Sequence, residues 1–333
     1  MLRIGIVGAG LRGRMYARAL GFVEGVEVAA IADASDAVRA EAGQALGVPT
    51  YATHAEMYDR ERLNAVIVAT PDFAHRAPAV DAVRAGLHLM IEKPLATTVE
   101  DAQAVQQAVG EAGVECMVAF ENRWNPAFVR VRELLDSGQV GDVLSQTARL
   151  SNPYSVPVSM LSWAAHSSPG WFLLPHTLDL ALWFSDKRPT KVYAAGFKRE
   201  LRARGIDTWD AIHALLTFED GTVASFESLW VLPDSAPSPV DFKYELIGTR
   251  SALYVDEQEQ LVRSLADRFT FPGTLTPEVD GRPRGFPAWM VESFARRLLA
   301  GEPLSPDVEQ GLLVTRIAAA VHYSLETGEP CPL

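Results

Sequence analysis

The sequence predicts an α/β fold, in which an N-terminal, doubly wound parallel sheet is followed by an α+β domain with a large, mostly antiparallel open sheet. Two patterns support this prediction. Short continuous apolar runs alternate with helical stretches up to about residue 120, which is typical of parallel strands buried on both faces. From about residue 190 the hydrophobic period changes to two, as in antiparallel strands. We therefore expect two domains, residues 1–121 and residues 122–333.

The first domain repeats a strand followed by a helix. An apolar strand over residues 2–7 leads through a glycine-rich turn into a helix over 14–20. Further strands are expected over 26–32, 65–69, 88–91 and 114–120, and further helices over 34–46, 76–85 and 99–112. Parallel strands joined by helices place their carboxyl ends along one edge of the sheet, and ligands bind beyond that edge. The residues that follow each strand are therefore the candidate site residues.

The turn after the first strand reads Gly8-Ala9-Gly10-Leu11-Arg12-Gly13. Glycines at this spacing suit a tight turn, the close approach of a diphosphate to the backbone, and the close packing of the helix on the strand. Negative phosphates would lie at the positive end of the following helix. The strand, the spacing and the helix together predict a dinucleotide site formed by these six residues.

Asp33 follows the second strand, about twenty residues after Gly13, where a dinucleotide-binding fold places the acid that accepts hydrogen bonds from the ribose hydroxyls. A carboxylate there repels a 2′-phosphate, so the predicted cofactor is NAD. Arg12 and Arg39 could weaken that preference, which leaves NADP possible.

The turn after the strand over 65–69 contains Thr70 and Pro71, with His75 beyond it. These residues could line the nicotinamide side of the cofactor. Alternatively, Pro71 only starts a helix and His75 is a solvated helical residue. The sequence leaves both interpretations open.

Glu92-Lys93-Pro94 follows the strand over 88–91. A lysine at the tip of a buried strand is partly desolvated, which lowers its pKa and suits it to contact a reacting group. The proline fixes the backbone after it and is a candidate for a cis peptide bond. An exposed loop lysine is the alternative, but the position at the sheet edge favours a functional Lys93.

In the second domain, His176 and Asp179 fall on one face of a helix expected over 169–185. They indicate either a general acid/base that points into a cleft or a helix whose polar groups pack and cap it. A His-x-x-Asp pattern without a further ligand cluster does not indicate a metal, and we predict none. The irregular segment over 151–170 contains Trp163, and its aromatic content indicates a wall of the substrate pocket.

The glycine turn, Thr70-Pro71 with His75, and above all Glu92-Lys93-Pro94 resemble the motifs of the Gfo/Idh/MocA oxidoreductases, the glucose-fructose oxidoreductase and inositol dehydrogenase group. The resemblance covers essentially the whole chain. It implies that the first domain is a Rossmann domain, with these motif residues and Asn122 at the cofactor.

The resemblance also implies that His176 corresponds to the active-site histidine of the family, and Asp179 to the acid three residues later. One position departs from the family. Many members carry an aspartate four residues before the histidine, where this chain has Phe172. The histidine then lacks that orienting carboxylate, so either the substrate differs from a polyol or another group, such as Asp179, replaces it.

The implied function is that of an NAD(P)-dependent oxidoreductase, which transfers a hydride between nicotinamide and a hydroxyl-bearing carbon of a sugar, polyol or related cyclic substrate. Lys93 would hydrogen-bond the reacting oxygen and His176 would act as acid and base. Arg123, Trp163 and Asp179 would bind the substrate with them. Two alternatives remain: an NAD-dependent glycoside hydrolase or lyase that oxidises its substrate transiently, and a non-catalytic NAD-binding regulator.

The formal net charge of −12 and the lack of a basic run argue against a nucleic-acid partner. The chain shows no charged-then-apolar leader and no apolar run long enough to cross a bilayer, so we expect a cytoplasmic protein with no membrane partner. In the related family the open face of the second sheet meets another subunit, which implies a homodimer or homotetramer formed through the C-terminal sheet.

The expected strands of the second domain mostly follow one another directly, whereas those of the first domain alternate with helices. The strands of the second domain are expected over 143–150, 191–199, 207–218, 222–232, 242–248 and 251–255, and its helices over 127–135, 169–185, 287–300 and 307–325.

Overall fold

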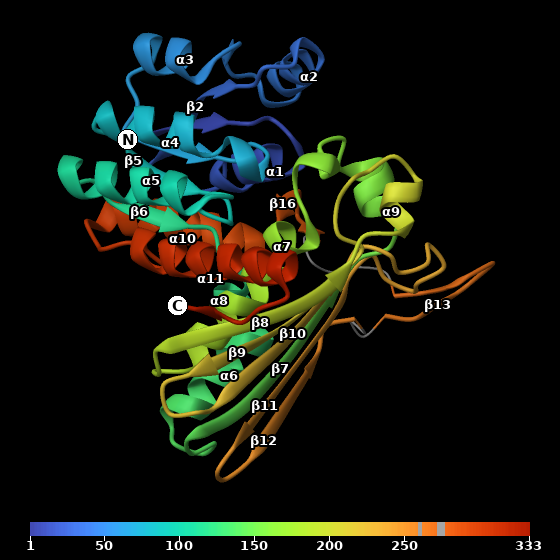
Figure 1. The fold of residues 1–333 in the computed structure, drawn as a ribbon. Helices are drawn as coiled ribbons and strands as arrows, with labels where there is room; N and C mark the ends of the chain where they lie inside the picture. Colours follow the sequence, from blue (N-terminus) through green and yellow to red (C-terminus); the bar gives the residue numbers. More distant parts are fainter. Residues whose placement is uncertain (259–261, 272–276) are drawn as a thin grey trace. The chain divides into compact units, whose positions relative to one another are not determined.

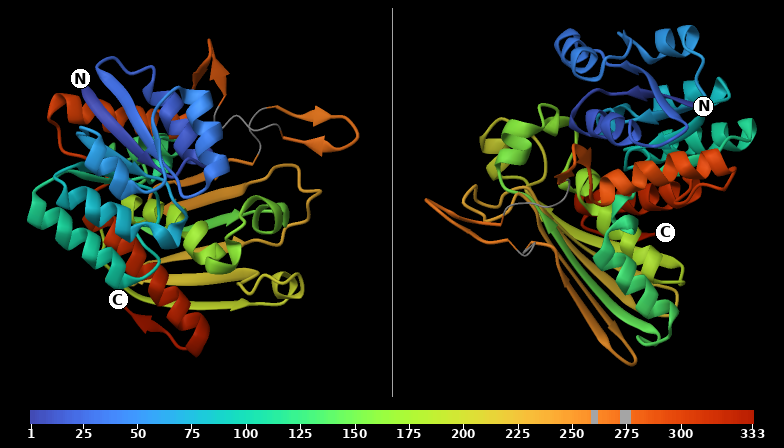
Figure 2. Two further views of the ribbon diagram at one scale, coloured as in Figure 1. Left: turned by 90° about the horizontal axis from the view of Figure 1, so that it is seen from above. Right: turned by 180° about the vertical axis from the view of Figure 1, so that it is seen from behind.

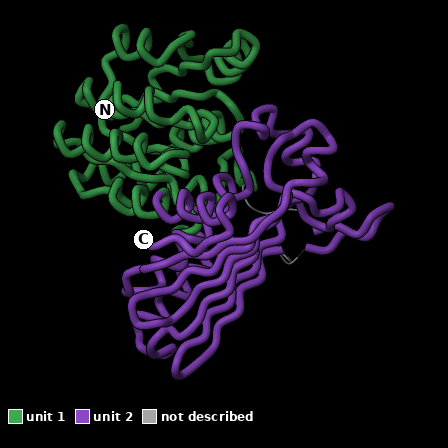
Figure 3. The backbone as a smooth tube through the Cα atoms, viewed as in Figure 1, with its two compact units in different colours: residues 1–124, 275–315 green, residues 125–274, 316–333 purple. Residues whose placement is uncertain are grey.

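A computed structural model describes residues 1–258, 262–271 and 277–333. The chain divides into two compact units, Met1–Trp124 with Leu275–Thr315 and Asn125–Thr274 with Arg316–Leu333 (Figure 3). The end of the first stretch lies close to the expected domain boundary at residue 121. The segment over 275–315, which the sequence assigned to the second domain, belongs to the first unit instead.

The first unit is built on a six-stranded sheet in the order β3-β2-β1-β4-β5-β6 (Figure 1). All neighbouring strands of this sheet pair in parallel. The strands are β1 (Leu2–Val7), β2 (Val26–Ala32), β3 (Thr50–Tyr51), β4 (Ala65–Val68), β5 (His88–Ile91) and β6 (Cys116–Val118). The chain adds strands to one side of β1 and then to the other, so the prediction of a doubly wound parallel sheet is confirmed.

Helices connect these strands and cover the sheet. They are α1 (Leu11–Leu20), α2 (Asp36–Leu46), α3 (His54–Arg60), α4 (Arg76–Arg84) and α5 (Val99–Ala112). A further helix, α10 (Phe286–Ala300), packs against α1. Its Met290 and Phe294 are completely buried in the same apolar core as Ile4 and Ile6 of β1. Helix α10 thus completes the first core, which explains why the chain returns to this unit.

The second unit is built on a seven-stranded sheet in the order β12-β11-β7-β10-β9-β8-β17. Neighbouring strands are antiparallel except β7 and β10, which are parallel. The strands are β7 (Val143–Ser151), β8 (Pro189–Phe197), β9 (Ala211–Phe218), β10 (Val223–Leu229), β11 (Asp241–Gly248), β12 (Ala252–Asp256) and β17 (Cys331–Pro332). The prediction of a large, mostly antiparallel sheet is confirmed.

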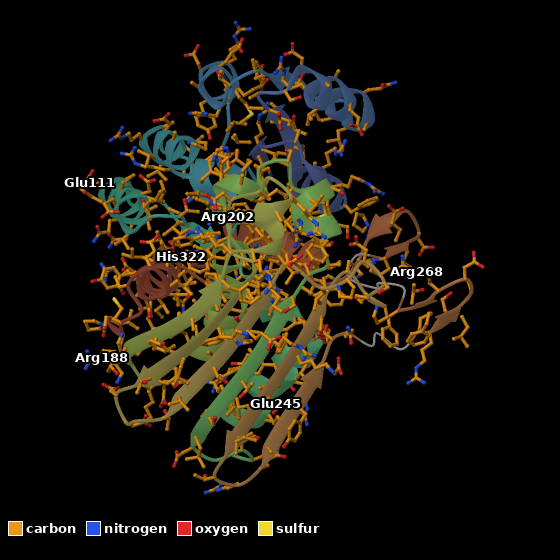
Figure 4. The ribbon with its side chains drawn as sticks, turned by 45° about the vertical axis from the view of Figure 1, so that its right-hand side comes forward. Glu111, Arg188, Arg202, Glu245, Arg268 and His322 are labelled. Carbon is orange, nitrogen blue, oxygen red and sulfur yellow. The ribbon has the colours of Figure 1, made fainter. Side chains whose placement is uncertain are left out.

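One face of this sheet is covered by α6 (Pro126–Asp136) and α8 (Leu174–Phe184), as the right-hand view of Figure 2 shows. The ring of Phe128 on α6 lies 5.1 Å from that of Phe242 and 5.8 Å from that of Tyr244. Because side chains alternate along a strand, the neighbours of these residues point to the opposite face. Glu245 is exposed there, on β11 (Figure 4).

The segment expected as one helix over 169–185 is two helices, α7 (Pro169–Phe172) and α8, with Leu173 between them. Pro175 has no N–H to continue the helical hydrogen bonds, and the His176 N–H donates to the Leu173 carbonyl oxygen over 3.1 Å, three residues back. The prediction of a single helix was therefore wrong. Phe172 and His176 do not lie one turn apart on one regular helix.

Within the described parts of the chain, no helix combines the length and the apolar character needed to cross a membrane.

Candidate active site

The glycine turn after β1 is shaped by backbone contacts. Gly8 has a φ of +97°, and a Cβ atom on it would lie 2.4 Å from the Ala69 carbonyl oxygen. A Cβ atom on Gly13 would lie 1.9 Å from the Gly8 carbonyl oxygen. Neither position can hold a side chain, since both neighbours are backbone atoms. These two glycines allow the turn and the close packing of α1 on β1.

Gly10 differs from the other two glycines of the turn. A Cβ atom on it would meet nothing within 4 Å. Gly10 caps α1 without a side-chain hydrogen bond, and the first turn of α1 contains no acidic residue. The backbone N–H groups at the start of α1 are therefore available to an anion, which the positive end of the helix also attracts. The turn fits the diphosphate of a dinucleotide.

Asp33, at the end of β2, is linked to the glycine turn. Its carboxylate accepts hydrogen bonds from the N–H groups of Ala9, at 2.8 Å, and Ser35, at 2.9 Å. Arg39 donates to the Asp33 carbonyl oxygen over 2.7 Å and pairs with Asp36. Asp33 is half-buried at the edge where the fold would hold a ribose.

Arg12 forms a bidentate ion pair with Glu121, which follows β6. Its two guanidinium nitrogens lie 2.6 and 2.8 Å from the carboxylate oxygens, and the Glu121 side chain is only 8% exposed. Paired in this way, Arg12 contributes little to a 2′-phosphate site. Of the two arginines that the sequence raised as possible phosphate ligands, Arg39 is the one beside Asp33.

His75 is buried, so its interpretation as a solvated helical residue was wrong. It is 1% exposed, with Nδ1 2.8 Å from the Pro94 carbonyl oxygen and Nε2 3.1 Å from the Thr70 carbonyl oxygen. Burial lowers the pKa of His75. Pro71 caps a short 3₁₀ helix, Asp72–Ala74, before α4. His75 therefore ties the turn after β4 to the turn after β5.

Glu92 and Lys93, after β5, are each 8% exposed, and the Lys93–Pro94 peptide bond is cis. The Tyr16 hydroxyl donates to Glu92 Oε1, and the Lys93 N–H donates to Glu92 Oε2 over 3.1 Å. Burial lowers the pKa of Lys93, while the Glu92 carboxylate opposes this effect. Lys93 is thus a desolvated amine at the carboxyl edge of the sheet, as an exposed loop lysine would not be.

No role was predicted from the sequence for Tyr16, and no ion-pair partner was predicted for Glu121. Tyr16 is completely buried and follows Arg12 by one turn of α1. A hydroxyl on the buried face of a helix needs a partner, and that requirement was the signal available in the sequence.

Asn122 is buried beside Glu121 in the 3₁₀ helix Glu121–Trp124, and Arg123 Nη1 lies 3.5 Å from Gln310 Oε1.

The remaining predicted site residues belong to the second unit. Phe172 packs between two tryptophans, with ring centroids 6.0 Å from Trp163 and 5.7 Å from Trp230. His176 is half-buried in the first turn of α8, and Asp179 is 1% exposed. Burial, with a contribution from the Asp179 charge, raises the pKa of Tyr244. Trp163, Phe172 and Trp230 thus form an aromatic wall, in which Phe172 takes the position of the aspartate of the related family.

His322 was not singled out in the sequence, and it holds α7 in place. It lies on α11 (Val308–Thr327; Figure 4), with Nε2 2.7 Å from the Ser168 hydroxyl and Nδ1 2.7 Å from the Ala318 carbonyl oxygen. Its ring stacks on Trp171 at 4.5 Å. Burial lowers the pKa of His322 to about 4, so the imidazole is neutral at neutral pH. The described residues contain no group of three or more possible metal ligands.

Two family models match the chain. Residues 2–120 match the model described as "Oxidoreductase family, NAD-binding Rossmann fold", and residues 128–254 match the "GFO/IDH/MocA C-terminal domain". Inositol 2-dehydrogenase 2 of Saccharopolyspora erythraea is 28% identical, over 100% of this chain and 95% of its own. D-xylose 1-dehydrogenase (NADP(+)) 2 of Haloferax volcanii is 27% identical, over 91% of this chain and 90% of its own.

Solved structures share the fold. Scyllo-inositol dehydrogenase from Lactobacillus casei, with bound NAD(H) and scyllo-inositol, superimposes with a TM-score of 0.85 at 21% identity, over 100% of this chain and 99% of that one. The two family models together match most of the chain, in the same order as its two sheets. The chain therefore belongs to the Gfo/Idh/MocA family of NAD-binding oxidoreductases.

Proposed function

We propose that this protein catalyses NAD-dependent hydride transfer at a hydroxyl-bearing carbon of a sugar, polyol or related cyclic substrate. The observation that carries the proposal is Lys93, a buried amine at the carboxyl edge of a sheet whose glycine turn fits a dinucleotide. The inositol and xylose dehydrogenases among its relatives support the substrate class. NAD, when bound, supplies the hydride acceptor.

In this proposal Lys93 hydrogen-bonds the reacting oxygen and stabilises the negative charge that develops on it as the alcohol is oxidised. His176 takes the hydroxyl proton and returns it in the reverse direction. Arg123, Trp163 and Asp179 contact the substrate. Gly8 to Gly13, Asp33, the Thr70–His75 turn and Asn122 form the NAD site, and Glu92 lies next to Lys93 at its edge.

The carboxylate of Asp33 makes NAD the preferred cofactor, because it repels a 2′-phosphate. Arg39 lies beside it and is the residue through which NADP would bind.

We further propose a homodimer or homotetramer in the cytoplasm, formed through the open face of the second sheet. Tyr193, Leu215 and Tyr254 are 44%, 43% and 70% exposed on that face, and sedimentation velocity would measure the assembly.

The function is tested by a screen of inositols, sugars and sugar acids with NAD and with NADP, using wild type and Lys93→Ala. We expect net NADH formation with one cyclic substrate and a loss of kcat of about 10³-fold in Lys93→Ala, with NAD affinity retained. Full activity of Lys93→Ala, or NADP bound more tightly than NAD, would contradict the proposal. Cleavage of a glycosidic bond without net NADH would instead identify a transiently oxidising hydrolase or lyase.

A further inference from the structure

Glu92 is held by two donors within the first unit. The buried Tyr16 hydroxyl donates to its Oε1, and the Lys93 N–H donates to its Oε2. The Glu92 side chain is buried, at 8% exposure. A buried carboxylate whose two oxygens both accept protein hydrogen bonds has its charge fixed at one place. That place is next to Lys93.

We propose that Glu92 is a positioning residue, which is itself anchored by Tyr16. Glu92 holds the backbone of Lys93 and supplies the negative charge opposite the Lys93 amine. This differs from a direct contact of Glu92 with the cofactor. The inference rests on the proposed function only for the catalytic use of Lys93, because the contact between Glu92, Tyr16 and Lys93 is present in the protein alone.

The charges around Lys93 make the expected effect specific. The carboxylates of Glu92, Glu121 and Asp72 favour the protonated amine, and the Arg12 guanidinium disfavours it. Two further polar side chains lie in this group. Burial raises the pKa of Tyr16 and lowers the pKa of His75, so both side chains are uncharged at neutral pH. Burial lowers the pKa of Lys93 most, and Glu92 is the strongest opposing charge. Removing that charge leaves burial less opposed, so the pKa of Lys93 falls further.

The direct test is the pH dependence of acetylation of Lys93 by acetic anhydride, measured by peptide mass spectrometry without NAD or substrate. In Glu92→Gln we expect the Lys93 profile to move to lower pH by about one unit or more, since an adjacent opposite charge shifts a pKa by that amount. The exposed Lys191 serves as the internal reference. An unchanged Lys93 profile in folded Glu92→Gln overturns the proposal.

Glu61→Gln is a matched control. Glu61 lies in the same unit, its side chain is 14% exposed, and it accepts a hydrogen bond from the Tyr51 hydroxyl over 2.8 Å. This variant also removes a tyrosine-bonded carboxylate, but one that does not contact Lys93. We expect the Lys93 profile to stay as in wild type. A shift equal to that of Glu92→Gln would show a general effect of charge and would contradict the proposal.

Two further measurements separate positioning from cofactor binding. In Glu92→Gln the dissociation constant for NAD should stay within about threefold, while the alkaline limb of kcat/KM moves to lower pH, because the protonated amine is the active form. A tenfold weaker NAD affinity with an unchanged Lys93 profile would make Glu92 a cofactor ligand instead. A Lys93 shift without any NADH-forming substrate would uphold this inference while the proposed function fails.

Tyr16→Phe keeps the charge and removes the anchor, so it remains informative if Glu92→Gln does not fold. We expect kcat to fall about tenfold with NAD affinity retained, because Glu92 loses one of its two donors and holds Lys93 less firmly. An unchanged kcat would contradict the anchoring by Tyr16.

Discussion

Two regions were assigned to chemistry from the sequence, and each is stabilised internally by a different kind of interaction. At the carboxyl edge of the first sheet, buried charges are matched by opposite charges, as in the pair of Arg12 with Glu121. In the α7–α8 region of the second unit, aromatic rings pack around Phe172, and the buried imidazole of His322 is neutral. The first region is stabilised by ion pairing, and the second by the packing of aromatic rings. Each can therefore be disturbed by a different kind of substitution.

The largest effect should come from the glycine turn, where backbone atoms leave no room. Gly13→Ala places a Cβ atom 1.9 Å from the Gly8 carbonyl oxygen, so we expect a loss of about 3 kcal/mol or more in the free energy of unfolding. Urea denaturation measures it. A Gly13→Ala protein as stable as wild type would mean that the turn is not set by backbone packing.

Gly10→Ala is the matched substitution in the same turn. Its Cβ atom meets nothing within 4 Å, so the stability should change by less than about 1 kcal/mol. The methyl group would occupy the space of the diphosphate, and we expect NAD affinity to fall at least about tenfold by calorimetry. Unchanged NAD binding would remove the assignment of this turn to the cofactor.

The neutral imidazole of His322 makes the second unit sensitive to acid. Its pKa is about 4 in the folded chain and about 6.5 when unfolded. Between these values the unfolded chain binds the extra proton, so stability falls as the pH falls, by at most about 3 kcal/mol. This contribution is fully present above the unfolded pKa. Urea denaturation at several pH values measures the slope.

His322→Phe keeps a ring against Trp171 but removes the titrating group. The variant should be less stable at neutral pH, since the Ser168 hydroxyl loses its acceptor. Its stability should nevertheless depend less on pH in the acid range. An equally steep loss in His322→Phe would place the acid sensitivity elsewhere.

A smaller effect is expected at the ribose side of the cofactor site. Asp33→Asn keeps an oxygen for the Ala9 N–H and removes the charge that repels a 2′-phosphate. The ratio of NADP affinity to NAD affinity should rise about tenfold, which is roughly 1.4 kcal/mol. Asp59→Asn, at an exposed position of α3, is the control with the same change of charge. No change of the ratio in Asp33→Asn would argue that Arg39 decides the cofactor.

The smallest effect should come from the aromatic wall. Phe172→Leu keeps an apolar side chain but loses the ring contacts with Trp163 and Trp230. Because Phe172 is only half-buried, we expect a loss of about 1 kcal/mol, measured by thermal unfolding. A loss as large as that of Gly13→Ala would mean that ring packing, like the glycine turn, is essential to the fold.

The sequence predicted the longer strands of both sheets but missed the two-residue edge strands β3 and β17, which are too short to show a hydrophobic period. Gly8 to Gly13 and Asp33 could be recognised because spacing along the chain sets their geometry. The partner of Arg12 could not, since Glu121 is 109 residues away and meets it only when β6 takes its place in the sheet. The helix over 169–185 was misjudged because its apolar period hides the missing N–H of Pro175.

The sequence by itself determined the fold class and the parallel and antiparallel character of the two sheets, because hydrophobic periodicity and turn residues are local properties of the chain. It also determined the glycine turn and the position of Lys93. Only the tertiary structure decided that α10 completes the first core, that His75 is buried and that Tyr16 anchors Glu92. These features depend on contacts between residues far apart in the sequence, which no local pattern encodes.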